Sequence, residues 1–209
     1  MIDAITGFPA KTLNVDAYLA DFWPYFHQIG QLNGAFWKLE CRQSFREPGN
    51  PSWEALARED WDEALRIIAE TTDEIRAPVL EASRVPMHRL RVVQRPYTPY
   101  LQWELQFIRV RAEAGERIRV LDAGALGDGR DLCRLPELVI LDSSVMYEVL
   151  YDDSGTLSGA RKILDTGVIE SCRREVAELF SRGEDLPAFL GRDQAVVPPV
   201  TRAVGKKAQ

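Results

Sequence analysis

The chain is poor in the residues that build metal sites, disulfide frameworks and membrane spans. It contains three cysteines and two histidines in 209 residues, and Cys41, Cys133 and Cys172 stand far apart. That spacing forms neither a zinc pattern nor a disulfide framework, so we expect reduced thiols, no metal and no cofactor. No apolar run approaches the roughly 20 residues that cross a bilayer, and residues 1–23 lack the basic and apolar regions of a secretory signal. We therefore expect a cytoplasmic protein without a membrane partner.

Lysine is also scarce, and the balance of charge is acidic. The 26 basic residues include five lysines and face 32 acidic residues, which gives a formal net charge of -6. A non-specific nucleic-acid binder needs a surplus of basic residues to displace counterions from phosphates. The composition argues against that class of protein but leaves room for one local basic groove.

Hydrophobic periodicity predicts helices in the first part of the chain. Helical spacing runs from Asn14 to about residue 32, where Pro24 predicts a kink or two shorter pieces. It returns as one helix or two from Ser52 to about Ser83. Between them, the aromatic segment 35–45 is a strand or a bent helix.

Short strands dominate the rest of the chain. We expect them at residues 90–94, 117–121, 138–142, 145–151 and 159–164, together with a helix after Thr98 and a last helix capped by Asp165. The fold class is therefore α/β (α+β). A helical N-terminal portion (1–85) packs on a mixed-sheet core (86–190), and a disordered tail (191–209) follows.

One supersecondary unit, residues 87–121, gathers guanidinium groups around an aromatic turn. Its arginines are Arg89, Arg91, Arg95, Arg109, Arg111, Arg117 and Arg119, and its rings are Tyr97, Tyr100 and Trp103. Guanidinium groups hold planar anions and stack on rings, and the helix that starts at Pro99 adds free backbone N–H groups. The unit predicts a site for a small anionic or aromatic ligand. Alternatively, these arginines pair with nearby glutamates while Trp103 lies in the core.

A second polar cluster, Glu40, Arg42, Gln43 and Glu47, precedes a proline-rich loop. Its two carboxylates could serve as a general acid and base or bind an amine. They could equally neutralise the arginines of residues 87–121, so that an internal Glu–Arg lattice explains both clusters without a ligand. No catalytic residue can be assigned, and the predicted ligand-binding residues are Glu40, Gln43, Glu47, Arg91, Arg95, Tyr97, Tyr100, Trp103 and Glu104.

Three motifs carry a resemblance to a known family. They read LECRQSFREPGNPSWEAL at residues 39–56, RLRVVQRPYTPYLQWEL at 89–105 and LPELVILD at 135–142. From about Phe36 to Leu190 the chain resembles an uncharacterised actinobacterial family of small cytoplasmic proteins. Members are commonly encoded beside helix-turn-helix regulators, and some occur in natural-product clusters. The resemblance implies a regulator as a partner and supplies no activity.

The order of elements in the second half is also similar to the phospholipase-D-like fold. That chemistry needs an H-x-K-x4-D motif, and neither His27 nor His88 can begin one. The resemblance therefore implies a phospholipase-D-like core without its catalytic motif.

Three functions follow from these patterns. The first is a non-catalytic module that binds a small ligand or a helix-turn-helix regulator through the Arg/aromatic site. The second is an enzyme of natural-product biosynthesis, a group transferase for which an aminoacyl-tRNA is a conceivable donor, and tRNA is a partner only in that case. The third is a structural partner without a ligand, favoured if the arginines prove to be paired inside the protein.

Overall fold

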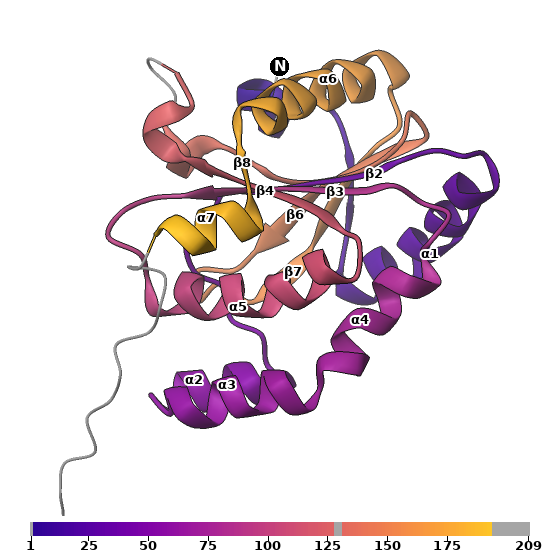
Figure 1. Cartoon of the computed structure of the whole chain (residues 1–209). Helices are drawn as coiled ribbons and strands as arrows, with labels where there is room; N and C mark the ends of the chain where they lie inside the picture. The colour runs from indigo at the N-terminus through magenta and orange to yellow at the C-terminus, as the bar shows by residue number, and fades with distance from the viewer. Residues whose placement is uncertain (1, 128–130, 194–209) are drawn as a thin grey trace, which may run out of the picture.

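One mixed β-sheet forms the centre of the protein (Figure 1). The computed structural model describes residues 2–127 and 131–193, and within them eight strands lie in the order β1-β7-β6-β5-β2-β3-β4-β8. The strands are β1 (Lys11–Leu13), β2 (Phe36–Glu40), β3 (Met87–Val93), β4 (Arg117–Asp122), β5 (Glu137–Leu141), β6 (Val145–Tyr151), β7 (Leu157–Ile163) and β8 (Glu184–Asp185). Strands β2, β3 and β4 are parallel, and the other pairs are antiparallel. The predicted mixed α/β fold class is confirmed, whereas the phospholipase-D-like likeness stays a prediction.

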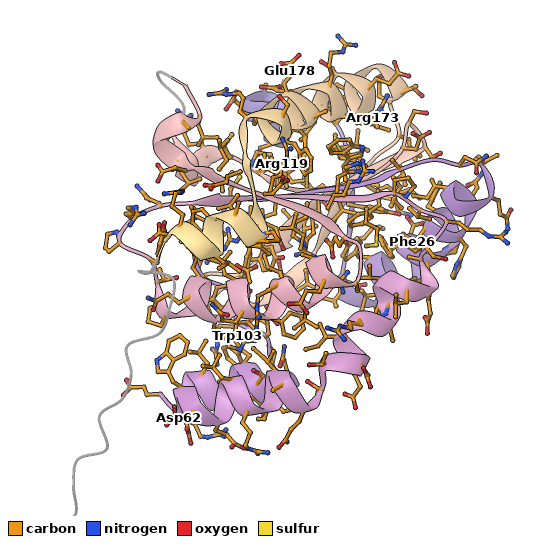
Figure 2. All side chains as sticks on the ribbon, viewed as in Figure 1. Phe26, Asp62, Trp103, Arg119, Arg173 and Glu178 are labelled. Carbon is orange, nitrogen blue, oxygen red and sulfur yellow. The ribbon has the colours of Figure 1, made fainter. Side chains whose placement is uncertain are left out.

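Helices cover both faces of the sheet. They are α1 (Val15–Gln31), α2 (Pro51–Ala57), α3 (Trp61–Glu70), α4 (Thr72–Glu81), α5 (Pro99–Glu113), α6 (Thr166–Arg182) and α7 (Leu186–Arg192), with short 3-10 helices at Ile2–Gly7, Ala123–Ala125 and Leu132–Arg134. In Figure 1, α6 lies above the sheet and α5 and α7 lie below it, while α2 and α3 form a further layer beneath α5. Figure 2 shows Trp103 between α5 and that outer layer.

Strand alternation separates an apolar face from a partly charged one. On the upper face, Leu39, Leu90 and Ile140 pack with Cys172 and Val176 of α6 in one buried cluster. The lower face is apolar where α1 covers it. Where α5 covers it, the same alternation directs charged side chains of β2 and β3 toward the helix. This charged part of the lower face positions the candidate site.

Local sequence signals account for the helix starts. The side chains of Asn14, Thr98 and Asp165 accept hydrogen bonds from backbone N–H groups three residues later, at 2.9, 3.1 and 2.9 Å. Such caps satisfy donors that have no partner inside a helix. Pro24 lies inside α1 and does not divide it into two. The helical stretch predicted over residues 52–83 is three helices, because the chain turns at Arg58–Asp60 and at Thr71.

The N-terminal portion, residues 1–85, supplies strands as well as helices. Strand β2 lies between β3 and β5, in the middle of the sheet, and β1 forms one edge. The boundary predicted at residue 85 therefore does not separate helices from sheet. The reason is that the aromatic segment after α1 alternates as a strand and pairs with β3 in parallel. In the predicted tail, α7 extends to Arg192, and residues 194–209 lie outside the described residues.

Candidate functional site

Arg91 is the most buried charged side chain of the candidate site. It is 0% exposed, and its Nε donates to Glu104 Oε2 of α5 at 2.7 Å. Its Nη1 donates to the carbonyl oxygens of Glu40 and Val92 at 3.3 and 3.1 Å. The arginine thus joins β2, β3 and α5, while its Nη2 is buried without a hydrogen-bond partner among the described residues.

Arg89 continues this network along the same face of β3. Its guanidinium donates to Glu40 at 2.7 Å and to Glu116 at 2.8 Å. Lys38 adds a second cation to Glu40, at 2.5 Å, and Arg111 adds one to Glu116 at the same distance. Hydrogen-bonded ion pairs of this kind offset the cost of burying each charge.

The remaining arginines of residues 87–121 lie near the surface. Arg95, Arg109 and Arg119 pair with Asp193, Glu113 and Asp185. Among the described residues, Arg117 has no carboxylate partner. The internal Glu–Arg lattice left open by the sequence therefore holds three of the seven guanidinium groups, those of Arg89, Arg91 and Arg111.

Burial and neighbouring charges shift the pKa values of three of the buried carboxyls, Glu40, Glu104 and Glu137. Burial alone would raise the pKa of Glu40, but the positive charges of Arg89, Lys38 and Arg91 outweigh it and hold that pKa well below its usual range. Burial raises the pKa of Glu104 to about 7 against the opposing charge of Arg91. Burial likewise raises the pKa of Glu137 to about 7, with Arg91 again opposing.

A hollow of about 440 Å³ opens where β2 ends, and we call it the Tyr100 hollow. It is lined by Val15, Lys38, Glu40, Phe45, Arg46, Glu47, Pro48, Tyr100, Tyr151, Thr156 and Leu157. Three predicted residues, Glu40, Glu47 and Tyr100, come together here from β2, the loop after it and α5. Volumes of this order are typical of small-molecule sites.

Three aromatic rings form one wall of the Tyr100 hollow. The ring of Phe45 lies 5.5 Å from that of Tyr100 and 4.6 Å from that of Tyr151, measured between centroids. The Tyr100 hydroxyl donates to Glu47 Oε1 at 2.6 Å, and Asn50 Nδ2 donates to Glu47 Oε2 at 3.1 Å. These contacts fix the Glu47 carboxylate against the rings.

The loop also places one cation at the Tyr100 hollow. The Arg46 guanidinium lies 5.8 Å from the centroid of Trp53. Within the part of the chain that the structure describes, Arg46 has no carboxylate partner, and Glu47 has no cationic one. The Tyr100 hollow therefore presents one cation and one carboxylate that have no oppositely charged partner among the described residues.

A second hollow of about 440 Å³, the Gln43 hollow, lies where β5 begins and β6 ends. It is lined by Cys41, Arg42, Gln43, Gln94, Leu132, Leu135, Pro136, Glu137, Glu148, Val149, Leu150 and Tyr151. Gln43 braces the ends of β2 and β3: its Nε2 donates to the carbonyls of Cys41 and Val92 at 2.6 and 2.9 Å, and its Oε1 accepts from the Gln94 N–H at 2.8 Å. Gln43 is thus a positioning residue with its amide already engaged.

Glu137 is anchored beside the Gln43 hollow by backbone groups. One carboxylate oxygen accepts from the N–H groups of Cys41 and Arg42 at 3.0 and 2.6 Å. These two consecutive N–H groups follow the last residue of β2, where pairing with β5 stops. The carboxyl therefore replaces the lost strand partner.

Five predicted residues line neither hollow, and Arg91 and Glu104 of the buried network are two of them. Arg95 and Tyr97 contact Asp193 after α7, and the Tyr97 hydroxyl donates to it at 2.7 Å. Trp103 is buried among α2, α3 and α5, where its Nε1 donates to Ser52 Oγ at 2.8 Å. Trp103 therefore occupies the core position that the alternative interpretation gave it.

Sequence reasoning missed several residues of the Tyr100 hollow. Lys38 alternates with Glu40 on β2, and Phe45 and Arg46 belong to the same loop, so spacing could have indicated all three. Tyr151 comes from β6, more than a hundred residues later, and no local signal marks it.

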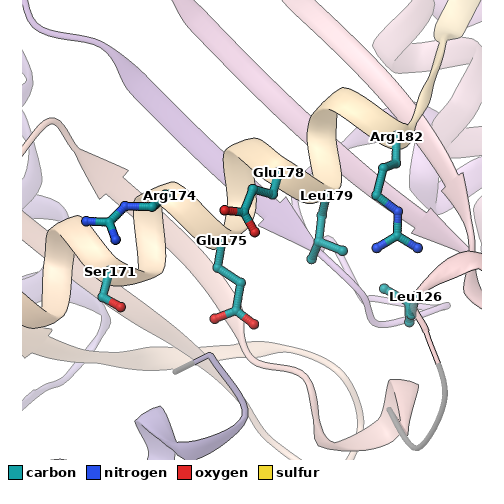
Figure 3. Close-up of a pocket in the computed structure, with 7 residues that line it drawn as sticks. All are labelled: Leu126, Ser171, Arg174, Glu175, Glu178, Leu179 and Arg182. Atoms are coloured by element: carbon teal, nitrogen blue, oxygen red, sulfur yellow. The ribbon is translucent and has the colours of Figure 1, made fainter.

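A further hollow of about 450 Å³ runs along α6 and contains none of the predicted residues (Figure 3). Charged side chains of α6 project from the helix there, and Arg182 lies opposite Leu126. Glu175 accepts from the Ile2 N–H at 3.0 Å, and Arg182 donates to the Ala125 carbonyl. These contacts fasten the N-terminal 3-10 helix and the segment after β4 to α6.

Two properties of the described residues bear on the class of site. Residues 2–127 and 131–193 contain no group of three or more His, Cys, Asp or Glu side chains placed to hold a metal ion. In the same ranges, every helix is too short or too polar to cross a membrane.

Comparison with known proteins gives a family and no activity. No curated protein and no solved structure gives a significant match. A family described as "Domain of unknown function (DUF6879)" matches residues 20–191. The chain belongs to the DUF6879 family.

Proposed function

We propose that this DUF6879 chain is a non-catalytic binding module. Its Tyr100 hollow takes a small aromatic ligand that carries both an acidic group and an amine. The observation that supports this proposal is the pairing of Arg46 and Glu47 beside three rings: both charges lack an oppositely charged partner among the described residues. A ligand with both groups would complete two ion pairs at once.

The rings set the class of ligand. Aromatic pairs favour edge-to-face or offset contacts, and Phe45 offers such a surface next to Tyr151 and Tyr100. A guanidinium binds a carboxylate through two parallel hydrogen bonds, which favours Arg46 for the acidic group. The Glu47 carboxylate is held by two donors and can accept a further hydrogen bond from an amine.

The pKa values of the ionisable residues that line the Tyr100 hollow favour binding over catalysis. A general acid or base works best when its pKa lies near the working pH. The cations around Glu40 keep that carboxylate ionised. Burial, together with Glu104 and Glu47, raises the pKa of Tyr100 well above its ordinary value, so its phenol keeps the proton that it donates to Glu47.

We propose a helix-turn-helix regulator as the protein partner. It would bind this chain differently when the Tyr100 hollow holds its ligand and when it does not. The support for this partner is the family resemblance carried by the three sequence motifs. Native mass spectrometry of the co-expressed pair would test it. We expect a complex whose stability changes with ligand, and the absence of any complex would remove the regulator from the proposal.

Glu137 supports a second candidate function, a group transferase of secondary metabolism for which an aminoacyl-tRNA is one candidate donor. Its carboxyl has a pKa of about 7 and lines the Gln43 hollow, at the carboxyl ends of β2 and β3. Ligands of open α/β sheets commonly bind at such strand ends. Under this candidate, Glu137→Gln abolishes turnover while Arg46→Gln leaves it intact.

Isothermal titration calorimetry tests the binding module. The probes are L-phenylalanine, N-acetyl-L-phenylalanine, which lacks the charged amine, and L-phenylalaninamide, which lacks the carboxylate. We expect L-phenylalanine to bind at least about tenfold more tightly than either derivative, since each loses a charge-assisted hydrogen bond. Arg46→Gln and Glu47→Gln should weaken its binding to a similar degree.

Arg58→Gln is the matched control, because Arg58 is an exposed arginine after α2 and lines neither hollow. It should leave the affinity unchanged. Equal binding of all three probes, or full affinity in Arg46→Gln, would overturn the assignment of the Tyr100 hollow.

A further inference from the structure

A separate hollow of about 300 Å³, which we call the Phe26 hollow, lies between α1 and α4. Its lining shares no residue with that of the Tyr100 hollow, and Figure 2 shows Phe26 at the opposite end of the molecule from α7. The rings of Phe22 and Phe26 stack at 5.5 Å, and that of Phe36 meets Phe26 edge-on at 6.0 Å. Trp23 stands at the rim with 51% of its surface exposed. The hollow therefore offers ring faces and ring edges to a flat ligand.

Arg111 gives this aromatic hollow a fixed positive charge. Its Nε donates to Glu116 Oε2, and its side chain, 16% exposed, lines the hollow. Among residues 2–127 and 131–193, its two terminal nitrogens have no hydrogen-bond partner. The bond to Glu116 orients the guanidinium, so its free end forms a pre-organised pair of donors.

The other charged residues that line the Phe26 hollow do not cancel the positive charge of Arg111. Glu81 and His27 also line the Phe26 hollow, and both are exposed. An exposed carboxylate is hydrated and screened, whereas a mostly buried guanidinium is not. A cationic ligand would be repelled by Arg111 at short range, and a neutral ligand would form no ion pair with it.

We infer that the Phe26 hollow binds a small aromatic carboxylate. The ligand's ring lies among Phe22, Phe26 and Trp23, and its carboxylate accepts hydrogen bonds from the terminal nitrogens of Arg111. Planar bidentate geometry favours a carboxylate at this end of the guanidinium. The volume suits a single-ring acid.

The test uses phenylacetate as the probe, with phenylacetamide as its neutral counterpart, in titrations followed by two-dimensional NMR. We expect phenylacetate to shift the signals of α1 and α4 and to bind at least about tenfold more tightly than the amide, because the amide forms no charge-assisted pair. Arg111→Gln should remove most of that difference. Trp23→Ala should weaken both probes, and its exposure makes a loss of folding unexpected.

Two controls separate this inference from the proposed function. Arg109→Gln changes an exposed arginine of the same helix and should leave phenylacetate binding unchanged. Arg46→Gln, which impairs the Tyr100 hollow, should do the same. The inference fails if phenylacetate and phenylacetamide bind equally, if Arg111→Gln retains full affinity, or if the shifted signals belong to the Tyr100 hollow.

Discussion

Replacing Arg91 by Met would test whether the buried arginine of β3 holds the fold together. The substitution removes the guanidinium but keeps an unbranched apolar side chain that fills the space of the arginine's aliphatic part. Glu104 then remains buried with no cation at hydrogen-bond distance among the described residues. We expect a large loss in the free energy of unfolding.

The magnitude follows from the geometry of the pair. At the observed separation of 2.7 Å, the Coulomb attraction is about 6 kcal/mol for an effective dielectric constant of about 20. Desolvation of both groups offsets much of it, but removing one partner of a buried pair typically costs about 3–5 kcal/mol. The exposed pair of Arg109 and Glu113, 3.6 Å apart, should contribute about 0–1 kcal/mol.

Urea denaturation at pH 8, where Glu104 carries its charge, provides the assay. Arg91→Met should be less stable than Arg109→Met by about 3 kcal/mol or more. The double variant Arg91→Met/Glu104→Leu should recover much of the loss, because it also removes the carboxyl that the single variant leaves buried without its cation. If the single variants are equally stable, or if the double variant is no better than Arg91→Met, the account of this pair is wrong.

Two further predictions concern Glu137 and Gly159. Burial keeps the folded-state pKa of Glu137 at about 7, above its ordinary 4.5. The folded state therefore retains a proton that the unfolded state releases, and this group's contribution to stability falls by up to about 3 kcal/mol as the pH rises from 4.5 to 7. Glu137→Gln should lack that fall in urea titrations, and parallel profiles for both proteins would contradict it. Gly159 has φ +142°, and a Cβ there would stand 2.1 Å from the Leu13 carbonyl oxygen. Gly159→Ala should therefore lower the thermal unfolding temperature strongly, whereas Gly191→Ala, which meets open space, should not.

Much of the fold follows from local physics. The caps at Asn14, Thr98 and Asp165 and the turn before Gly155 are short-range signals, and the structure has each element where they indicate it. The central place of β2 does not follow from such signals. All five of its residues pair with β3 and the first four also pair with β5, and both of these strands lie far along the chain.

The buried network around Arg89 and Arg91 also could be predicted from the sequence only in part. Alternation correctly puts Arg89 and Arg91 on one face of β3. Whether that face meets a ligand or a helix depends on how α5 packs, which spacing along the chain does not reveal. Glu116 follows α5 by three residues and Glu40 precedes α2, yet both converge on Arg89.

Only some of the residues predicted for the candidate site lie together in one hollow. Glu40, Glu47 and Tyr100 reach one hollow because β2 and the loop after it run beside the start of α5. Trp103 lies one helical turn from Tyr100 on α5 and therefore reaches the core formed with α2 and α3. The rings of Tyr100 and Trp103 lie 5.4 Å apart in one buried cluster, but the Tyr100 hydroxyl donates to Glu47 whereas the Trp103 indole donates to Ser52.

A crystal structure of the chain with L-phenylalanine would test the central claim most directly. The account predicts the ligand's ring against Phe45 and Tyr151, its carboxylate on Arg46 and its amine on Glu47, with the pair of Arg91 and Glu104 intact. A ligand bound away from the Tyr100 hollow, or an Arg91 side chain that leaves Glu104 to contact the ligand, would contradict it.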